Sequence, residues 1–286
     1  MASTGVAETA MTSPPTHDIL ADTATLPLLP AQRRQHIVEF LHRHGAVTLQ
    51  QLEQALRVSV STLRRDLDAL AAEGEVDRTH GGALLRHQEY STFEPDHLAA
   101  AELSPREKEA IGRAAAAALV PRQSVIFDSG STVAEAARAA LARRIPLVAV
   151  TNDLAIAQLL GSSSLVRVHV LGGVLREGSN TLTGESVIEA ARAIGADVLL
   201  MGAHAVTDGV MSETAPEVAA VKRALIRAAA SRRLLVDSSK FRPRTFMSIG
   251  SVADLDEVIT DEGIDADEAK RLRAAGVRLT VANAAR

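Results

Sequence analysis

The chain has 286 residues, a formal net charge of −4 and no cysteine. This length leaves room for a small domain and a larger one with its own core. The lack of cysteine excludes a disulfide scaffold, a thiolate metal site and a cysteine nucleophile, and we expect neither a metal nor a cofactor. The net charge argues against non-specific coating of nucleic acid, whereas a locally basic face still allows specific binding. The sequence shows no run of 18 apolar residues and no signal-peptide pattern, so we expect a cytoplasmic protein that does not contact a membrane.

The first structured elements are expected after residue 30. Residues 1–30 are rich in Ala, Thr, Ser and Pro without periodicity, which predicts a disordered tail. A helix over residues 33–44, closed by Gly45, precedes a second short amphipathic helix over residues 48–57. Only Val58 and Ser59 separate this second helix from a third one.

The third helix begins in the stretch VSVSTLRRDLDAL, residues 58–70. Val60, Leu63, Leu67 and Leu70 recur at a spacing that places them on one buried side of a helix. Ser59 is expected to be its N-cap. Two short helices joined by a tight turn predict a helix-turn-helix.

The opposite face of the third helix combines short polar side chains with two arginines. Ser61 and Arg65 lie on it, flanked by Thr62 and Arg64. Short side chains at a helix N-terminus followed by arginines fit the DNA major groove, which is roughly 12 Å wide. The alternative is an ordinary solvated basic face. The run EVDRTHGGALL, residues 75–85, alternates around His80 as a β-hairpin would, which predicts a winged helix-turn-helix.

The combined run VSVSTLRRDLDALAAEGEVDRTHGGALL resembles the signature of the DeoR family of bacterial transcriptional regulators. That signature is VS-x-x-T-[IL]-RRDL followed by G-x-[ILV]-x-R-x-HGGA. Its positions are all matched, by Val58, Ser59, Thr62, Leu63, Arg64, Arg65, Asp66, Leu67, Gly74, Arg78, His80, Gly81, Gly82 and Ala83. The resemblance implies a domain over residues 31–86 that binds double-stranded operator DNA; a protein-interaction module of the same shape is the alternative.

Roles on DNA are assigned by side-chain chemistry. We expect Arg65, with Ser61 and Thr62, to contact bases, because arginine pairs bidentately with guanine. Arg64, Arg78 and His80 are expected to contact phosphates. The complete predicted DNA-binding set is Ser59, Ser61, Thr62, Arg64, Arg65, Arg78 and His80.

A polar connection over residues 87–105, with two prolines, is expected to link this domain to a second one over residues 106–286. The second domain alternates helical segments with short apolar runs rich in Val, Ile and Leu. Strands are expected at 124–128, 146–151, 166–173, 197–203, 233–239, 256–261 and 277–281, with helices between most of them. This pattern predicts a doubly wound α/β fold with a mostly parallel sheet.

Ligands of such sheets bind beyond the carboxyl ends of the strands. After the first strand come Asp128, Ser129, Gly130, Ser131 and Thr132, followed by a helix. A glycine turn, hydroxyl groups and a helix N-terminus together form an anion cradle. Thr151 and Asn152, Gly172 and Gly173, and Lys240 follow later strands, and Lys222 lies on a helix. A lysine near a strand end can neutralise a phosphate, although each feature by itself is typical of ordinary turns and surfaces.

The runs FDSGST, VTND, VLGG, VKRALIRAAA, LLVDSSKF and VITD are similar, in order and spacing, to the effector domain of DeoR-type regulators. This domain is related in fold to sugar-phosphate isomerases and CoA transferases and senses phosphorylated sugars or related metabolites. The resemblance spans residues 31–261. It implies a site made of Asp128, Ser129, Gly130, Ser131, Thr132, Thr151, Asn152, Gly172, Gly173, Lys222 and Lys240. Residues 203–217, AHAVTDGVMSETAPE, depart from the family pattern, which leaves the recognition of the sugar body open.

Two function classes follow. The first is a regulator, expected to be a repressor of carbohydrate-metabolism genes, that binds operator DNA as a homo-oligomer and responds to a phosphorylated sugar or polyol. The second is an isomerase-like enzyme with an accessory DNA- or protein-binding module, for which Asp128, Asp153, Glu185 and Asp237 are the available acids. A fused DNA-binding domain gives a binding-only pocket a use, so we expect sensing without catalysis.

Overall fold

The computed structural model describes residues 29–44, 46–79, 81–85 and 103–284. Residues 1–28 of the predicted tail at 1–30, the Gly45 cap, His80 and most of the connection, 87–102, lie outside the described residues, whereas Pro30 begins a helix.

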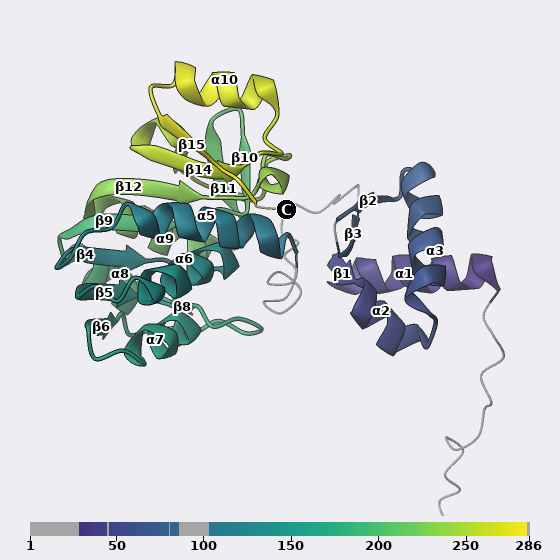
Figure 1. The fold of residues 1–286 in the computed structure, drawn as a ribbon, viewed down its shortest axis with the longest axis horizontal. Helices are drawn as coiled ribbons and strands as arrows, with labels where there is room; N and C mark the ends of the chain where they lie inside the picture. The colour runs from purple at the N-terminus through teal and green to yellow at the C-terminus, as the bar shows by residue number, and fades with distance from the viewer. Residues whose placement is uncertain (1–28, 45, 80, 86–102, 285–286) are drawn as a thin grey trace, which may run out of the picture.

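The N-terminal elements form three helices and a small antiparallel sheet with strand order β1-β3-β2 (Figure 1). In chain order they are α1 (Pro30–His44), β1 (Ala46–Thr48), α2 (Leu49–Leu56), α3 (Val60–Ala72), β2 (Val76–Arg78) and β3 (Gly82–Leu85). Ile37, Leu41, Leu52, Leu63 and Leu67 are fully buried between them. The periodic apolar positions thus form the core, and the winged helix-turn-helix is confirmed.

Local interactions explain the tight turns of this unit. A capping box starts α2, because the Thr48 hydroxyl accepts from the Gln51 amide at 3.1 Å and the Gln51 side chain accepts from the Thr48 amide at 2.9 Å. Arg57 ends α2 in a left-handed conformation with φ of 53°. A Cβ on Gly82 would lie 1.8 Å from the Val47 carbonyl oxygen, so only glycine lets β3 pair with β1. Strand β1, with three residues, was not predicted.

The C-terminal elements alternate helices with strands. They are α5 (Pro105–Ala117), β4 (Ser124–Phe127), α6 (Ser131–Ala142), β5 (Leu147–Thr151), α7 (Leu154–Gly161), β6 (Val166–Val170), β7 (Val174–Leu175), β8 (Leu182–Thr183), α8 (Glu185–Arg192), β9 (Ala196–Met201), β10 (Ala205–Thr207), β11 (Val210–Glu213), α9 (Pro216–Arg227), β12 (Ala229–Leu235), the 3-10 turn η1 (Ser238–Lys240), β13 (Met247–Ser251), the 3-10 turn η2 (Val252–Asp254), β14 (Glu257–Asp261), α10 (Ala266–Ala274) and β15 (Arg278–Ala282).

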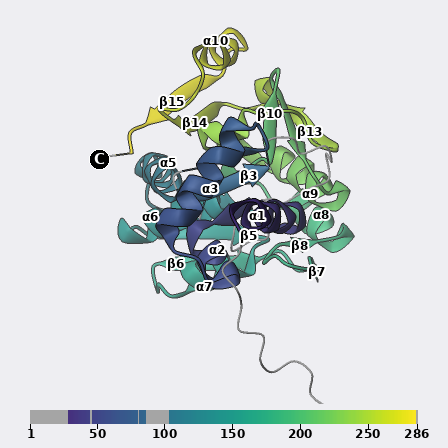
Figure 2. The same ribbon diagram turned by 90° about the vertical axis from the view of Figure 1, so that its right-hand side faces the viewer.

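Seven of these strands form one parallel sheet in the order β15-β14-β12-β9-β4-β5-β6. Side chains alternate across it: Val125 and Phe127 pack with α5, α6 and α7, whereas Ile126 packs with α8 and α9. Figure 2 shows α5 and α6 on one side of the sheet and α8 and α9 on the other. The predicted doubly wound α/β fold is confirmed.

Two smaller sheets were not predicted. Strands β10, β11 and β13 form an antiparallel sheet, and β7 and β8 form a hairpin. Their sequences, VL, LT, AVT, VMSE and MSIGS, lack the apolar runs that predicted the strands of the large sheet. Among the described helices, none combines the length and the apolar character needed to cross a bilayer.

Candidate functional site

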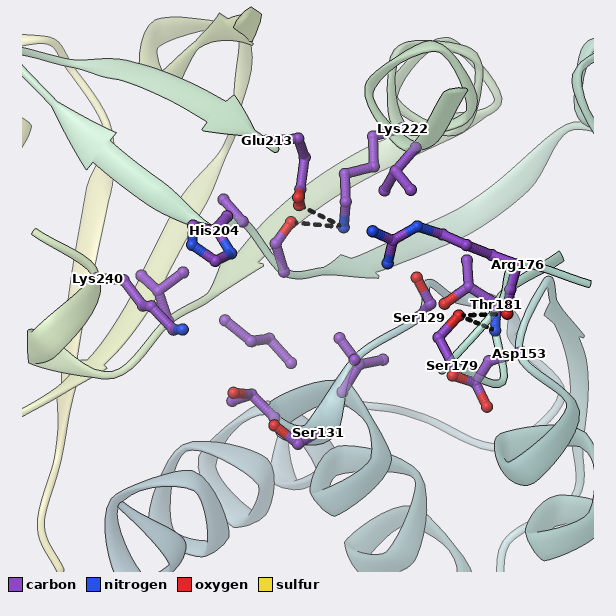
Figure 3. A pocket seen from close by; sticks show the side chains of 18 of the residues that line it. Ser129, Ser131, Asp153, Arg176, Ser179, Thr181, His204, Glu213, Lys222 and Lys240 are labelled. Atoms are coloured by element: carbon purple, nitrogen blue, oxygen red, sulfur yellow. Dashed lines mark hydrogen bonds and ion pairs between the residues drawn. The ribbon is translucent and has the colours of Figure 1, made fainter. Parts of the chain in front are cut away.

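The strand order of the large sheet reverses between β4 and β9. From β4 the chain continues outward through β5 and β6, and from β9 it continues the other way through β12, β14 and β15. A pocket of about 130 Å³ opens at the carboxyl ends of these two central strands (Figure 3). It is lined by Ser129, Gly130, Ser131, Thr132, Val133, Asp153, Arg176, Gly178, Ser179, Thr181, Gly202, Ala203, His204, Glu213, Val218, Lys222, Leu235, Val236 and Lys240. Ligands bind at this switch point in doubly wound sheets.

The N-terminus of α6 forms one wall of the pocket. Gly130 is its N-cap with φ of 118°, a conformation that side chains rarely adopt. Gly130 has no side chain with which to cap this helix. A helix N-terminus attracts an anion, and this one lies beside the hydroxyls of Ser129, Ser131 and Thr132.

A buried charge cluster forms another part of the pocket. The Lys222 ammonium group donates to the Asp128 carboxylate and, at 3.0 Å, to the Gly202 carbonyl. Glu213 Oε1 lies 3.5 Å from the same ammonium group. Burial would lower the pKa of Lys222, but Asp128 and Glu213 together raise it, so the lysine stays charged. The cluster fixes two carboxylates around one cation instead of leaving a free cation for a ligand.

Lys240 and His204 both bring nitrogen atoms to the pocket, but only Lys240 carries a positive charge near pH 7. Burial and the nearby Arg242 lower the pKa of Lys240 to about 8, so the lysine is mostly charged near pH 7. Burial, assisted by Lys240 and Arg242, strongly lowers the pKa of His204, so the imidazole is neutral. Lys240 can attract an anion, whereas His204 can only exchange hydrogen bonds.

The pocket contains residues that the sequence did not assign to it. Arg176, Ser179 and Thr181 come from the β7–β8 hairpin, and His204 and Glu213 come from the segment of β10 and β11. Among these residues, only Asp153 could have been assigned to the pocket from the sequence, because it follows the end of a predicted strand. Asp153 also caps α7 by accepting from the Ala155 amide at 2.9 Å. The other positions depend on short strands without a recognisable pattern.

Several predicted effector residues do not line the pocket. Asp128 belongs to the charge cluster. Thr151 accepts from the Asp153 amide at 3.0 Å, and Asn152 donates to the Leu182 carbonyl at 3.2 Å, so both hold the chain next to the pocket. A Cβ on Gly173 would lie 2.5 Å from the Thr183 carbonyl oxygen, which gives this glycine a packing role. Gly172 is exposed.

Helix α3 presents the predicted DNA-binding face. Ser61, Arg64 and Arg65 are exposed, and neither arginine makes an ion pair or hydrogen bond with any described residue. The Ser59 hydroxyl lies 3.1 Å from the Ser61 hydroxyl and 3.0 Å from the Thr62 hydroxyl. Ser59 is the N-cap, as predicted, although its side chain does not bind a backbone amide of the helix.

Two further positions of the arginine motif serve the structure. Asp66 pairs with Arg33, whose Nη2 lies 3.0 Å from Asp66 Oδ1, and thereby ties α3 to α1. Arg78 Nε lies 2.9 Å from Asp68 Oδ1, and its Nη1 donates to the Gly82 carbonyl at 3.1 Å. Arg78 therefore connects the β2–β3 wing with α3. Among the described residues, no group of three or more His, Asp or Glu side chains is arranged to hold a metal ion.

Comparisons with known proteins agree with both parts. The family described as "DeoR-like helix-turn-helix domain" matches residues 33–89, and that described as "DeoR C terminal sensor domain" matches residues 103–262. The glycerol-3-phosphate regulon repressor of Escherichia coli is 32% identical over 231 residues, covering 80% of this chain and 90% of the relative. The HTH-type transcriptional repressor GlcR of Bacillus subtilis is 31% identical, covering 80% and 88%.

One solved structure that this chain matches in part is ribose 5-phosphate isomerase A of Neisseria gonorrhoeae. It is 17% identical, covers 48% of this chain and 53% of its own, and has a TM-score of 0.36, a similarity too distant to bear on function.

The family matches and the identities over most of the chain lead to one conclusion. The protein belongs to the DeoR family and is a transcriptional regulator that combines a DNA-binding helix-turn-helix with a C-terminal sensor domain.

Proposed function

We propose that the protein is a repressor of carbohydrate-metabolism genes, controlled by a phosphorylated sugar or polyol that binds in the switch-point pocket. The observation that carries this proposal is the N-terminus of α6, which has glycine as its N-cap and shares its pocket with Lys240. A helix N-terminus and a nearby ammonium group both favour a phosphate group. The Escherichia coli relative is a regulon repressor named for glycerol 3-phosphate, and this ligand chemistry supports the proposal.

Within the pocket, Ser129, Gly130, Ser131, Thr132 and Lys240 would hold the phosphate. The ion pair between Asp128 and Lys222 would form the base of the pocket. Thr151, Asn152, Gly172 and Gly173 would act by shaping the chain around the pocket.

On the DNA side, Arg65, Ser61 and Thr62 would read bases, and Ser59 would hold their hydroxyl cluster in place. Arg64, Arg78 and His80 would contact phosphates. The exposure of Arg64 and Arg65 supports contact of both with DNA, because a cation without a protein partner is available to DNA; the division between bases and phosphates rests on side-chain chemistry.

The proposed role includes binding without turnover. Isomerisation needs a carboxylate free to move a proton beside the substrate carbonyl. Asp128 and Glu213 instead both pair with the Lys222 ammonium group, which holds these two carboxylates in place. An aldose–ketose isomerase assay with common sugar phosphates should show no rate above buffer; turnover would make the enzyme the better proposal.

The regulator would act in the cytoplasm, away from membranes, as a homo-oligomer. Residues 31–86 would form the DNA-binding domain, residues 87–105 the linker and residues 106–286 the sensor domain, behind a tail at 1–30. Two protomers would present two α3 helices to successive major grooves.

The test is binding of the full chain to DNA from upstream of its own gene, at fixed salt, with and without a panel of sugar and polyol phosphates. We expect preference over random DNA and a change of affinity with one compound. Equal binding to random DNA, unaffected by every compound, would contradict the proposal.

A further inference from the structure

His204 differs from the other residues that line the pocket. Its side chain is 6% exposed, and its Nε2 is enclosed. Among the pocket-lining residues in the described part of the chain, only His204 leaves a buried side-chain nitrogen or oxygen atom without a hydrogen-bond partner. A buried polar atom without a partner costs about 1–3 kcal/mol, so its presence in a binding pocket suggests that a ligand supplies the partner.

Hydrogen bonds hold the backbone of His204 in place on both sides. The His204 amide donates to the Ser212 carbonyl at 3.1 Å, which joins it to β11. Its carbonyl accepts from Arg242 Nε at 3.3 Å and from Arg242 Nη2 at 3.1 Å. The backbone that carries the ring is therefore positioned before a ligand arrives, and a preorganised backbone loses little conformational entropy on binding.

The charges around His204 decide which kind of group it can bind. Burial lowers the pKa of His204, and four nearby cations lower it further: Lys240, Arg242, Lys222 and Arg176. The imidazole is therefore neutral. A neutral imidazole has one N–H donor and one acceptor nitrogen. A hydroxyl group, which both donates and accepts, matches it better than a phosphate, whose charge is better met at α6 and Lys240.

The position of the ring fits the same division. In Figure 3, His204 lies between Lys240 and Glu213, across the pocket from Ser131 at the start of α6. A ligand with its phosphate near Ser131 and Lys240 would thus bring its uncharged body towards His204.

We propose that His204 is a specificity-determining residue that hydrogen-bonds a hydroxyl group on the body of the phosphorylated effector. This inference rests on the proposed function. It assigns a role to residues 203–217, for which the sequence left the recognition of the sugar body open, and it selects polyhydroxylated phosphates over phosphates that lack the hydroxyl group.

The test compares the full-length protein with three variants by isothermal titration calorimetry. His204→Phe keeps a ring of similar size without its nitrogens, and His204→Gln retains a donor and an acceptor. His169→Phe, at an exposed position of β6, is the matched control. The probes are inorganic phosphate, ribose 5-phosphate with 2-deoxyribose 5-phosphate, glucose 6-phosphate with 2-deoxyglucose 6-phosphate, and glycerol 3-phosphate.

We expect the sugar or polyol phosphate that binds the native chain most tightly to lose about tenfold or more in affinity with His204→Phe, the equivalent of one lost hydrogen bond to a buried group. His204→Gln should recover most of this loss, and His169→Phe should bind like the native chain. Inorganic phosphate should bind all four proteins alike, which also shows that the variants are folded.

Two results would overturn the inference. Binding of that compound to His204→Phe within twofold of the native chain would mean that the ring makes no such hydrogen bond. An equal loss of inorganic phosphate would mean that His204 shapes the whole pocket. A native chain that binds no compound and no phosphate would instead reject the proposed function, and this outcome is distinguishable because it needs no variant.

Discussion

Arg65 and Arg64 are adjacent, exposed and unpaired in the described part of the chain, yet they project from different sides of α3. Arg65 lies four residues after Ser61, so both are on the same face of α3, near its N-terminus. The N-terminal part of a recognition helix is where side chains contact base edges. Substitution of these arginines would therefore show whether α3 contacts bases or only phosphates.

Arg65→Ala should cost about 1–3 kcal/mol on the specific operator and relax its sequence preference, because a bidentate arginine contact distinguishes bases. Fluorescence anisotropy with operator and random DNA at several salt concentrations measures both quantities. Arg113→Ala, which removes an exposed arginine from α5, is the charge-matched control. Equal losses on operator and random DNA would show that Arg65 contacts only phosphates.

Lys240 is the proposed cationic contact for the effector phosphate. Lys240→Ala should abolish the effector response while leaving operator affinity nearly intact, since the residue lies in the turn after β12 and not on the DNA-binding face. Operator binding with and without the active compound measures the response. The control is Lys270→Ala, an exposed lysine on α10. A normal response of Lys240→Ala would mean that the phosphate binds elsewhere.

The pKa of Lys240 predicts how effector affinity depends on pH. A phosphate monoester becomes a dianion above pH of about 6, so affinity should rise through this pH. Lys240, whose pKa is lowered to about 8, loses its charge as pH rises further. Affinity should therefore fall about tenfold between pH 7 and pH 9. Calorimetric titration across this range measures it. Lys240→Arg stays charged and should not show the decline; the same decline in that variant would contradict the assignment.

At the scale of elements, the close crossing of α5 and α6 supports the wall that carries the anion cradle. A Cβ on Gly112 would lie 2.6 Å from the Glu135 carbonyl carbon and 2.7 Å from the Ala136 nitrogen. The glycine thus lets two helix backbones approach each other on one face of the sheet. The α6 N-terminus depends on this packing for its position.

Gly112→Ala should force α5 and α6 apart and lower the free energy of unfolding by about 1–3 kcal/mol. Urea denaturation followed by circular dichroism measures this change. Gly161→Ala is the control, because a Cβ added there would meet no atom within 4 Å and alanine favours the helix. Unchanged stability of Gly112→Ala would mean that the helices separate without cost.

At the scale of the whole molecule, regulation requires that effector binding in the pocket changes the affinity of the DNA-binding helix α3 for its operator. An effector that favours one arrangement of the DNA-binding domains by about 1–3 kcal/mol changes operator affinity roughly 5- to 150-fold. In the proposed homo-oligomer a two-fold axis would relate two α3 helices, and the operator would then be symmetric as well.

We expect operator half-sites centred roughly 10.5 bp, or a multiple, apart. Inserting about 5 bp between them turns one half-site to the opposite side of the duplex and should weaken binding strongly, whereas about 10 bp should restore much of it. Gel-shift titrations of the three operators measure this, together with the mass of the complex by light scattering. Equal affinity for all three would contradict binding by paired helices.

Local sequence predicted the α-helices and the seven strands of the large sheet, but not the strands of the smaller sheets. The periodicity of Leu63, Leu67 and Leu70 predicted the buried side of α3, because a helix repeats every 3.6 residues. Alternating helical and apolar runs predicted the parallel sheet, and the glycine turn at Gly130 predicted the anion cradle. These features depend on neighbours a few residues apart, which the sequence displays directly.

Only the tertiary structure decided which residues meet. It paired Lys222 with Asp128 and Glu213, residues that the sequence separates by 94 and 9 positions, and so gave a lysine expected to contact effector a buried structural partner. It brought His204 and Arg176 to the pocket through strands too short to recognise. The position of a residue relative to distant parts of the chain follows from strand order and packing, and neither periodicity nor spacing encodes that order.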